Sequence, residues 1–291
     1  MSEGFVEVTG GRVWYRIAGG VQDRACLLCL HGGPGFTHDS VSPLEGLADE
    51  RQVVFYDQLG SGRSDRPEDP SLYRLERYVD EVMRVRDELG LARVHLVGHS
   101  WGGGLALAYA LAGHPGIESL VLASPLISTD RWLEDARRLR SELPQDEQRI
   151  LARHEESGHT GCPEYVAATM AFYRRHLCRL EPWPEELERA YAGMGPDVYE
   201  TMWGPTEFHA TGTLLDLDLE PRLSELRVPV LFTCGRHDEA SPETVGSFRD
   251  AVDGAELEVF EQSSHTAHLE ERDRYLEVVR SFLTRAEHSR G

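Results

Sequence analysis

The sequence contains no lysine, and all 30 of its basic residues are arginine. A protein without lysine cannot form a Schiff base with pyridoxal phosphate. It also cannot supply the lysine of a phosphate-binding loop or use a Ser–Lys nucleophile pair. The absence of lysine therefore removes three mechanisms before any motif is considered.

Cysteine is scarce: there are five, an odd number without the spacing of a disulfide framework. This pattern argues against a secreted protein held together by disulfides. Cys26 and Cys29 form a C-x-x-C pair, but they lie in the apolar run A-C-L-L-C-L, which is typical of a buried strand. Side chains three positions apart on a strand point to opposite faces, so we expect this pair neither to bind a metal nor to form a redox disulfide.

Long hydrophobic runs are missing as well. No stretch of about 18 apolar residues is present, so we expect no membrane-spanning helix. The first residues, M-S-E-G-F-V-E-V, have neither a basic start nor an apolar stretch, and they predict no signal peptide. A cytoplasmic location is the resulting expectation.

Basic residues are fewer than acidic residues. Asp and Glu number 50 against 30 basic residues, which gives a formal net charge of −20 and a pI near 5.0. Nucleic acids and anionic membranes bind cationic surfaces, so we expect neither as a partner. The length of 291 residues, 40% of them hydrophobic, suits one large α/β domain or a domain with an insertion.

Short apolar runs recur along the chain and predict strands. Segments 5–8 and 13–17 flank Thr9-Gly10-Gly11 and predict an opening hairpin. Six further runs are typical of a mostly parallel sheet whose strands are buried on both faces. They are 26–30, 53–56, 94–97, 120–123, 230–233 and 257–260.

Helical patterns lie between these runs, at 72–89, 103–112, 242–252 and 267–286. Alternating strands and helices predict right-handed crossovers, with helices on both faces of the sheet. The interval from 126 to 220 breaks this rhythm, and a bare loop of that length is improbable. It contains charged helical stretches at 131–142, 146–157, 165–180 and 185–192. We therefore predict a helical cap, residues 126–220, inserted into a discontinuous core domain formed by residues 1–125 and 221–291.

A candidate nucleophile follows the predicted strand 94–97. Ser100 is the central residue of G-H-S-W-G, a G-x-S-x-G pattern placed between a strand and a helix rich in small residues. Such a tight turn holds the serine hydroxyl at the carboxyl end of the sheet. The backbone N–H of Trp101, at the start of the helix, is then a candidate oxyanion donor.

The strand 26–30 ends in H-G-G-P-G, a loop whose backbone can approach a ligand closely. We expect the N–H of Gly33 to be the second oxyanion donor, opposite that of Trp101. The alternative is a glycine-rich turn without a catalytic role.

A serine nucleophile requires an imidazole and an orienting carboxylate. Asp238 follows the strand 230–233, and His265 follows the strand 257–260, so both are expected at the same sheet edge as Ser100. His268 competes as the base, but it falls in the first turn of the last predicted helix. Glu239 competes with Asp238 as the orienting acid.

These elements together resemble the proline iminopeptidase family of α/β-hydrolases, which also includes amino-acid amidases. The matching segments span most of the chain in order. They are H-G-G-P-G (31–35), Y-D-Q-L-G-S-G-R-S (56–64), G-H-S-W-G-G (98–103), G-P-T-E-F (204–208), G-R-H-D-E-A-S-P (235–242) and S-S-H-x-x-H-L-E (263–270). The resemblance implies an α/β-hydrolase fold with Ser100 as nucleophile, Asp238 as orienting acid and His265 as base.

The resemblance also implies that Glu207 and Glu239 bind the free α-amino group of the substrate. Two carboxylates suit this role, because each offers a charge-assisted hydrogen bond worth about 1.5–3 kcal/mol. An N-blocked substrate would leave them buried and unpaired. Without the resemblance, Glu207 has the pattern of a solvated residue.

Several other residues have less specific expectations, and two of them, Asp57 and Arg63, also match the family pattern. Asp57 and Arg63 are expected to be structural, holding the loop after the strand 53–56. Some aromatic residues either line an apolar pocket or pack in the core. They are Phe36, Trp132, Tyr199 and Trp203.

The expected activity is that of a serine hydrolase acting through an acyl-enzyme. It would release an N-terminal amino acid, proline or another small or apolar residue, from short peptides or amino-acid amides. No cofactor is expected, nor any metal, because no H-E-x-x-H or similar ligand spacing is present. Two alternatives stay open: an acyltransferase or specialised amide or ester hydrolase of a biosynthetic pathway, and a non-catalytic receptor on the same fold.

Overall fold

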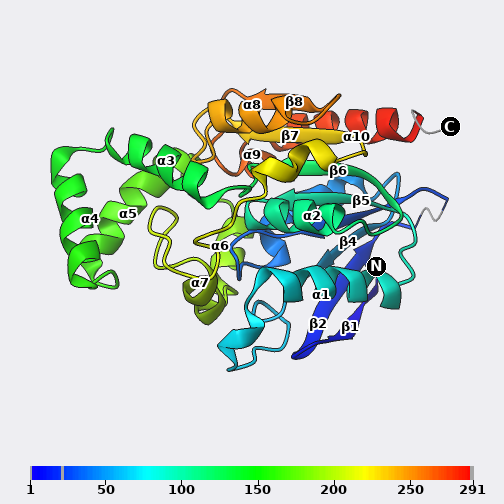
Figure 1. Cartoon of the computed structure of the whole chain (residues 1–291), viewed down its shortest axis with the longest axis horizontal. Helices are drawn as coiled ribbons and strands as arrows, with labels where there is room; N and C mark the ends of the chain where they lie inside the picture. The colour runs from blue at the N-terminus through cyan, green and yellow to red at the C-terminus, as the bar shows by residue number, and fades with distance from the viewer. Residues whose placement is uncertain (1, 21–22, 289–291) are drawn as a thin grey trace.

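The computed structural model of the chain describes residues 2–20 and 23–288. Within these residues eight strands form one sheet in the order β1-β2-β4-β3-β5-β6-β7-β8 (Figure 1). The strands are β1 Ser2–Val8, β2 Gly11–Ala18, β3 Cys26–Leu30, β4 Val53–Tyr56, β5 Val94–His99, β6 Ile117–Ala123, β7 Val230–Gly235 and β8 Glu256–Phe260. The eight predicted strands are all present, and β3 and β4 have the predicted bounds.

The sheet is mostly parallel, as predicted. The opening hairpin pairs β1 with β2 in antiparallel register, and β2 also runs antiparallel to β4. All remaining pairs, from β4–β3 to β7–β8, are parallel. The carboxyl ends of β3, β5, β6, β7 and β8 therefore meet at one edge of the sheet, where the predicted site residues follow them.

Strand β8 differs from the expectation of burial on both faces. Residues Leu257–Val259 are partly exposed and Glu256 is exposed, whereas β3 to β7 are buried throughout. The reason is its position: β8 forms one edge of the sheet, and no other described strand pairs with its outer side. Short strands with charged residues are common at such edges.

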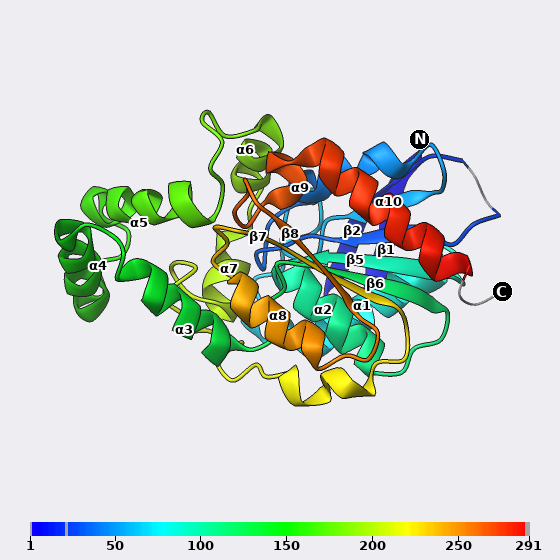
Figure 2. The same ribbon diagram turned by 90° about the horizontal axis from the view of Figure 1, so that it is seen from above.

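Helices cover both faces of the sheet (Figure 2). They are α1 Leu75–Glu88, α2 Trp101–Leu111, α3 Thr129–Arg140, α4 Gln145–Ser157, α5 Pro163–His176, α6 Glu185–Ala192, α7 Pro196–Met202, α8 Pro242–Asp250, α9 Ala267–Glu270 and α10 Arg272–His288. Three short 3₁₀ helices, His38–Leu47, Pro70–Leu72 and Glu220–Glu225, complete the set within the described residues. The helix predicted at 267–286 is divided at Glu271 into α9 and α10, and α7 was not predicted.

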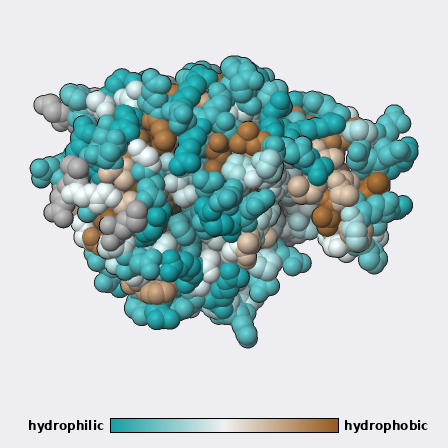
Figure 3. Space-filling model, turned by 180° about the vertical axis from the view of Figure 1, so that it is seen from behind, coloured by the Kyte–Doolittle hydropathy of each residue, from teal (hydrophilic) through white to brown (hydrophobic). Residues whose placement is uncertain are grey.

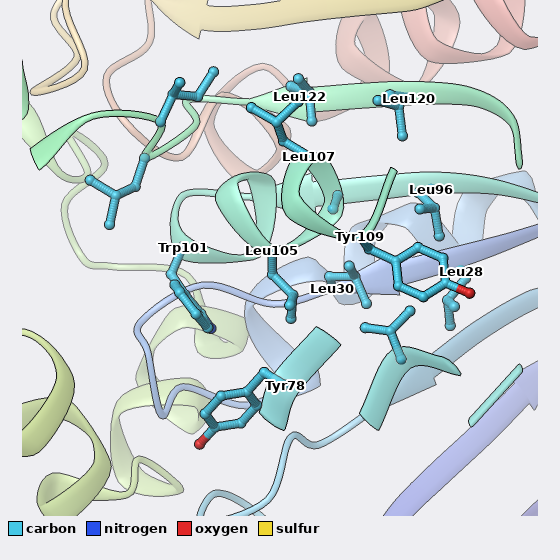
Figure 4. Packing of buried hydrophobic residues seen from close by; sticks show 14 of the residues in the cluster. Leu28, Leu30, Tyr78, Leu96, Trp101, Leu105, Leu107, Tyr109, Leu120 and Leu122 are labelled. Atoms are coloured by element: carbon cyan, nitrogen blue, oxygen red, sulfur yellow. The ribbon is translucent and has the colours of Figure 1, made fainter. Parts of the chain in front are cut away.

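Alternate side chains of each strand enter different hydrophobic clusters. Leu28 and Leu30 pack with α1, α2 and α8, whereas Leu27 and Cys29 pack with the 3₁₀ helix His38–Leu47 and with α10. Figure 4 shows Leu105 and Leu107 of α2 beside the leucines of the neighbouring strands. Cys26 lies in the first cluster and Cys29 in the second, which confirms that the C-x-x-C pair faces opposite sides of the sheet.

The chain between β6 and β7 is helical, with five α-helices, α3 to α7, the 3₁₀ helix Glu220–Glu225 and no sheet strand among its described residues. Figure 1 shows α3, α4 and α5 extending past the end of the sheet. Leu139, Leu151, Tyr165 and Phe172 from these helices form a hydrophobic cluster of their own with Phe208. A separate cluster is what a cap with its own core requires, but the domain boundaries at 126 and 220 stay a prediction.

The surface carries the acidic and polar residues that the composition predicts. Hydrophilic residues cover most of the face drawn in Figure 3, and apolar residues appear there in small separate patches. Among the helices in the described part of the chain, none combines the length and apolar character needed to cross a bilayer.

Candidate active site

Ser100 lies on a tight turn between β5 and α2. Its backbone has φ 56° and ψ −120°, and it is one of two non-glycine residues with positive φ in the described chain. The turn needs glycine on both sides of the serine. A Cβ on Gly98 would lie 2.1 Å from the carbonyl oxygen of Gly102, and a Cβ on Gly102 would lie 2.2 Å from that of Leu30. The strained backbone is therefore maintained by close packing of strand, turn and helix.

The loop after β3 lies directly against this turn. A Cβ on Gly32 would be 3.2 Å from the Cβ of Ser100, and Gly33 follows with φ 112°. Trp101 begins α2, and the first N–H groups of a helix have no acceptor within the helix. The segments that carry the two candidate oxyanion donors, Gly33 and Trp101, thus both border Ser100, while the role of their N–H groups stays a prediction.

Gln58 joins the two segments that carry these donors. Its side-chain Nε2 donates to the carbonyl oxygen of His31 at 2.9 Å, and its Oε1 accepts from the indole Nε1 of Trp101 at 2.9 Å. Its backbone N–H also donates to Nε2 of His31 at 2.9 Å. Burial lowers the pKa of His31 to about 4, so its imidazole is neutral and able to accept this bond.

Asp238 and His265 are in contact, as predicted. The Nδ1 of His265 lies 2.8 Å from Oδ1 of Asp238. Because an ionised carboxylate only accepts hydrogen bonds, this contact places the imidazole proton on Nδ1 and leaves Nε2 able to take a proton. The N–H of Ala240 also donates to Oδ1 (2.9 Å), and the N–H of Gly235 donates to Oδ2 (3.2 Å), so the carboxylate is fixed on both oxygens.

Ser100 and His265 are neighbours but are not joined by a hydrogen bond in the described chain. His99 connects them: its Nε2 donates to the backbone oxygen of His265 at 2.9 Å, and the two rings are 4.7 Å apart. Catalytic hydrogen bonds often reach full length only when substrate is bound. The contact between serine and imidazole therefore stays a prediction, while the contact between imidazole and carboxylate is present.

The segment that carries His265 is held by the end of α5. The N–H of His265 donates to the carbonyl oxygen of His176 at 3.1 Å, and Oγ1 of Thr266 donates to that of Leu177 at 3.1 Å. Trp132 of α3 packs edge-on against the His265 ring at 5.4 Å. The helices between β6 and β7 thus take part in positioning the candidate base.

Glu207 is buried beside this imidazole. Its Oε1 accepts a hydrogen bond of 2.8 Å from the hydroxyl of Tyr199, and its backbone oxygen accepts one of 2.9 Å from Nε1 of Trp132. Burial raises the pKa of the Glu207 carboxyl, while His265 and the Tyr199 hydroxyl act in the opposite direction. The structure thus places this residue in the site, and not on a solvated surface.

Glu239 is completely buried, and neither of its carboxylate oxygens has a hydrogen-bond partner among the described residues. Its Oε1 lies 3.9 Å from Nε2 of His265. Burial raises the pKa of Glu239 well above its ordinary value, and the negative charges of Glu207 and Asp238 act in the same direction. A buried carboxyl without partners is costly, so this position is suited to a cationic ligand.

The remaining expectations have mixed outcomes. Asp57 accepts hydrogen bonds from the N–H groups of His38 (2.8 Å) and Arg63 (2.9 Å), which confirms its structural role in the loop after β4. Phe36 and Tyr199 line a cavity next to Glu207, whereas Trp203 packs against Trp132 at 6.1 Å. The competing base, His268, is bonded through Nε2 to the carbonyl oxygen of Ser40 at 2.8 Å and is therefore structural.

Sequence reasoning missed Ser124. Its Oγ donates to Oδ2 of Asp238 at 2.5 Å. Its backbone has a positive φ of 47°, as does that of Ser100. Its sequence position could have indicated this role, because Ser124 directly follows β6. In the sheet, β6 lies between β5, which precedes Ser100, and β7, which precedes Asp238. Within residues 2–20 and 23–288, no group of three or more potential ligands is arranged to hold a metal ion.

Comparisons with known proteins agree with this geometry. Residues 26–272 match the family model described as the alpha/beta hydrolase fold. A proline iminopeptidase of Heyndrickxia coagulans is 42% identical over 283 residues, covering 97% of this chain and 98% of that protein.

Two solved structures are also similar over nearly the full length. The crystal structure of VinJ superimposes with a TM-score of 0.95 and 39% identity, covering 98% of this chain and 99% of that one. The proline iminopeptidase of Mycobacterium smegmatis has a TM-score of 0.92 and 37% identity, with 100% of both chains covered. This chain is therefore a hydrolase that belongs to the proline iminopeptidase family of α/β-hydrolases.

Proposed function

We propose that this protein is a serine hydrolase that releases an N-terminal amino acid from short peptides or amino-acid amides. The observation that carries the proposal is the pair of buried carboxylates beside His265. Glu239 has no hydrogen-bond partner on either oxygen among the residues that the structure describes, and Glu207 has one from Tyr199. An ammonium group in this place would supply the missing donors and neutralise the paired charge.

The proposed substrate is bound by its α-amino group, which lies between Glu207 and Glu239. The carbon of the scissile carbonyl is bonded to the α-carbon that carries this amine. Binding of the amine therefore holds the carbonyl next to the imidazole and the serine. Its oxygen points to the N–H groups of Gly33 and Trp101. Each such donor typically contributes about 10²–10³ to the rate.

In the proposed reaction, the hydroxyl oxygen of Ser100 attacks the carbonyl carbon while Nε2 of His265 takes the hydroxyl proton. Asp238 holds the Nδ1 proton and stabilises the imidazolium that forms. His265 then gives the proton to the leaving nitrogen, the C–N bond breaks, and an acyl-enzyme remains. Water, deprotonated by the same imidazole, hydrolyses the ester and releases the free amino acid.

The similarity to proline iminopeptidases supports proline as one accepted N-terminal residue. The helices between β6 and β7 lie over the carboxyl edge of the sheet, and α5 contacts the segment of His265. We therefore propose that they restrict access to short substrates and exclude folded proteins.

The test is a panel of aminoacyl amides, each paired with its N-acetylated twin, together with a fluorophosphonate probe for the serine. We expect labelling of Ser100 and turnover of the free amines, with the blocked twins hydrolysed at least a hundredfold more slowly. Equal rates on both members of each pair would contradict the proposed amine site.

A variant of one carboxylate separates recognition from chemistry. Glu207→Gln should reduce kcat/KM strongly on proline amide but only slightly on a simple ester without an amino group. The matched control is Glu200→Gln, a change of the same type at an exposed position of α7. Equal losses on the amide and the ester would mean that Glu207 acts on the chemistry or the fold and not on the ammonium.

A further inference from the structure

A cavity of about 250 Å³ lies between α5, the end of α6, α7, the segments that follow α6 and α7, and the loop after β3. Most of its lining is aromatic, aliphatic or methionine, including Phe36, Val166, Met170, Tyr173, Tyr191 and Met194. Glu207 is the one residue with a charged side chain among the described residues that line it. The cavity is thus an apolar space with a single carboxylate in its wall.

The cavity borders the amine end of the proposed site. Both partners of the hydrogen bond between Tyr199 and Glu207 line it, whereas Ser100 and His265 do not. A substrate held by its ammonium at Glu207 would therefore have this space beside it, and its reacting carbonyl, at Ser100, would lie outside the cavity.

The size of the cavity exceeds what a proline ring requires. At about 30 Å³ for a group of the size of a water molecule, the three methylene groups of the ring fill roughly a third of the available space. Burying apolar surface favours binding, so the remaining space would increase affinity for a larger apolar group.

We infer that this cavity holds a bulky apolar group of the substrate, so that the preferred substrate is amphiphilic. It carries a free ammonium at the two carboxylates and an aromatic or long aliphatic group in the cavity. The inference rests on the proposed function, because it uses the same amine site. The apolar group belongs either to the N-terminal side chain or to the part of the substrate that follows the scissile bond.

Binding of simple amines tests the cavity without any chemistry. We would titrate methyl-, butyl- and hexylammonium into the protein by calorimetry. Each methylene that enters the cavity should increase affinity about fourfold. Affinity that does not change with chain length would overturn the inference, whether or not the protein is an aminopeptidase.

Two neighbouring positions of α5 provide a matched pair of variants. Val166 lines the cavity and is 49% exposed, so Val166→Trp would fill space without disturbing the core. Ala167 is exposed and does not line the cavity, so Ala167→Trp is the control. We expect the dependence on chain length to flatten in Val166→Trp and to persist in Ala167→Trp. The same dependence in both would overturn the inference.

Thr169 allows a variant that should keep or increase the affinity of the cavity for apolar groups, whereas Val166→Trp should reduce it. It is buried in the lining, and its hydroxyl has no hydrogen-bond partner among the described residues. Thr169→Val removes this hydroxyl at nearly the same volume, so hexylammonium should bind at least as tightly as to the wild type. Tenfold weaker binding would mean that the cavity holds a polar group at this point and would contradict the inference.

Two substrate series identify which part of the substrate enters the cavity. One varies the N-terminal residue of an amide from alanine to leucine and phenylalanine, and the other varies the amine of an alanine amide from methyl to hexyl. We expect kcat/KM to rise at least tenfold along one series and this rise to shrink at least fivefold in Val166→Trp. No rise along either series would overturn the inference, whereas no turnover together with an unlabelled Ser100 would contradict the proposed function instead.

Discussion

The indole Nε1 of Trp101 donates a hydrogen bond of 2.9 Å to Oε1 of Gln58, whose Nε2 in turn donates to the carbonyl oxygen of His31 at 2.9 Å. One amide side chain thus joins the segment of each candidate oxyanion donor, although Gln58 itself comes from the loop after β4. The spacing of the two donors therefore depends on a residue that bonds to the indole of Trp101 and to the carbonyl of His31, and not to either donating backbone N–H.

Gln58→Leu should consequently lower kcat about tenfold and change KM little, because misplaced donors weaken binding of the transition state more than of the substrate. Steady-state kinetics on proline amide provide the measurement. Ser64→Ala is the control, since it breaks buried hydrogen bonds to Trp14 and Asp57 in the same loop and leaves the Gln58 contacts in place. A similar loss of kcat in both variants would indicate a general loosening of the loop.

Ser100→Ala should remove nearly all turnover and all labelling by a fluorophosphonate probe, because no other hydroxyl is expected to replace the nucleophile. The positive φ at this position is unfavourable for alanine as well as for serine, so stability should change little. Circular dichroism and thermal unfolding would check the fold. Activity retained in a folded variant would refute the assignment of the nucleophile.

Glu239 should make the stability of the protein depend on pH. Its pKa is raised well above the ordinary 4.5 by burial and by its acidic neighbours. A carboxyl with a higher pKa in the folded than in the unfolded chain stabilises the fold fully below about pH 4.5, and this contribution is lost as pH rises through the folded pKa. Glu239→Gln removes the titration. In urea unfolding, the wild type should therefore lose stability relative to the variant between pH 4.5 and neutral pH.

The control for this comparison is Glu200→Gln, which neutralises an exposed carboxyl. Its free energy of unfolding should follow the wild-type pH dependence closely. If the free energy of unfolding of Glu239→Gln also follows the wild-type pH dependence, the pKa of Glu239 is not raised by burial and by its acidic neighbours.

Ser124→Ala should reduce kcat roughly tenfold, because the Asp238 carboxylate loses the hydroxyl donor at 2.5 Å and is less firmly oriented towards His265. The backbone donors from Gly235 and Ala240 remain, so the loss should be much smaller than for Asp238→Ala. Parallel kinetics of the two variants would check this order. An equal loss in both would mean that Ser124 has a role beyond orienting the carboxylate.

Much of the fold follows from local patterns. The apolar runs at 26–30 and 53–56 coincide with β3 and β4, and the helix expected at 185–192 coincides with α6. α7 escaped prediction because its seven residues, beginning at Pro196, are too short for a clear helical period. The exposure of β8 escaped it too, since an edge position depends on which strands pair and not on the strand itself.

The sequence by itself determined the strands, the glycine turn around Ser100 and the order of the candidate nucleophile, acid and base, because these depend on residues close together in the chain. Only the tertiary structure decided that Gln58 bridges the two donor segments, that Ser124 supports Asp238 and that Glu239 is buried without a partner in the described part of the chain. Those contacts join residues that are tens of positions apart or depend on the polar groups around a buried side chain, and no local pattern specifies them. Their positions result from the packing of separate strands at one edge of the sheet, which brings chain-distant loops together.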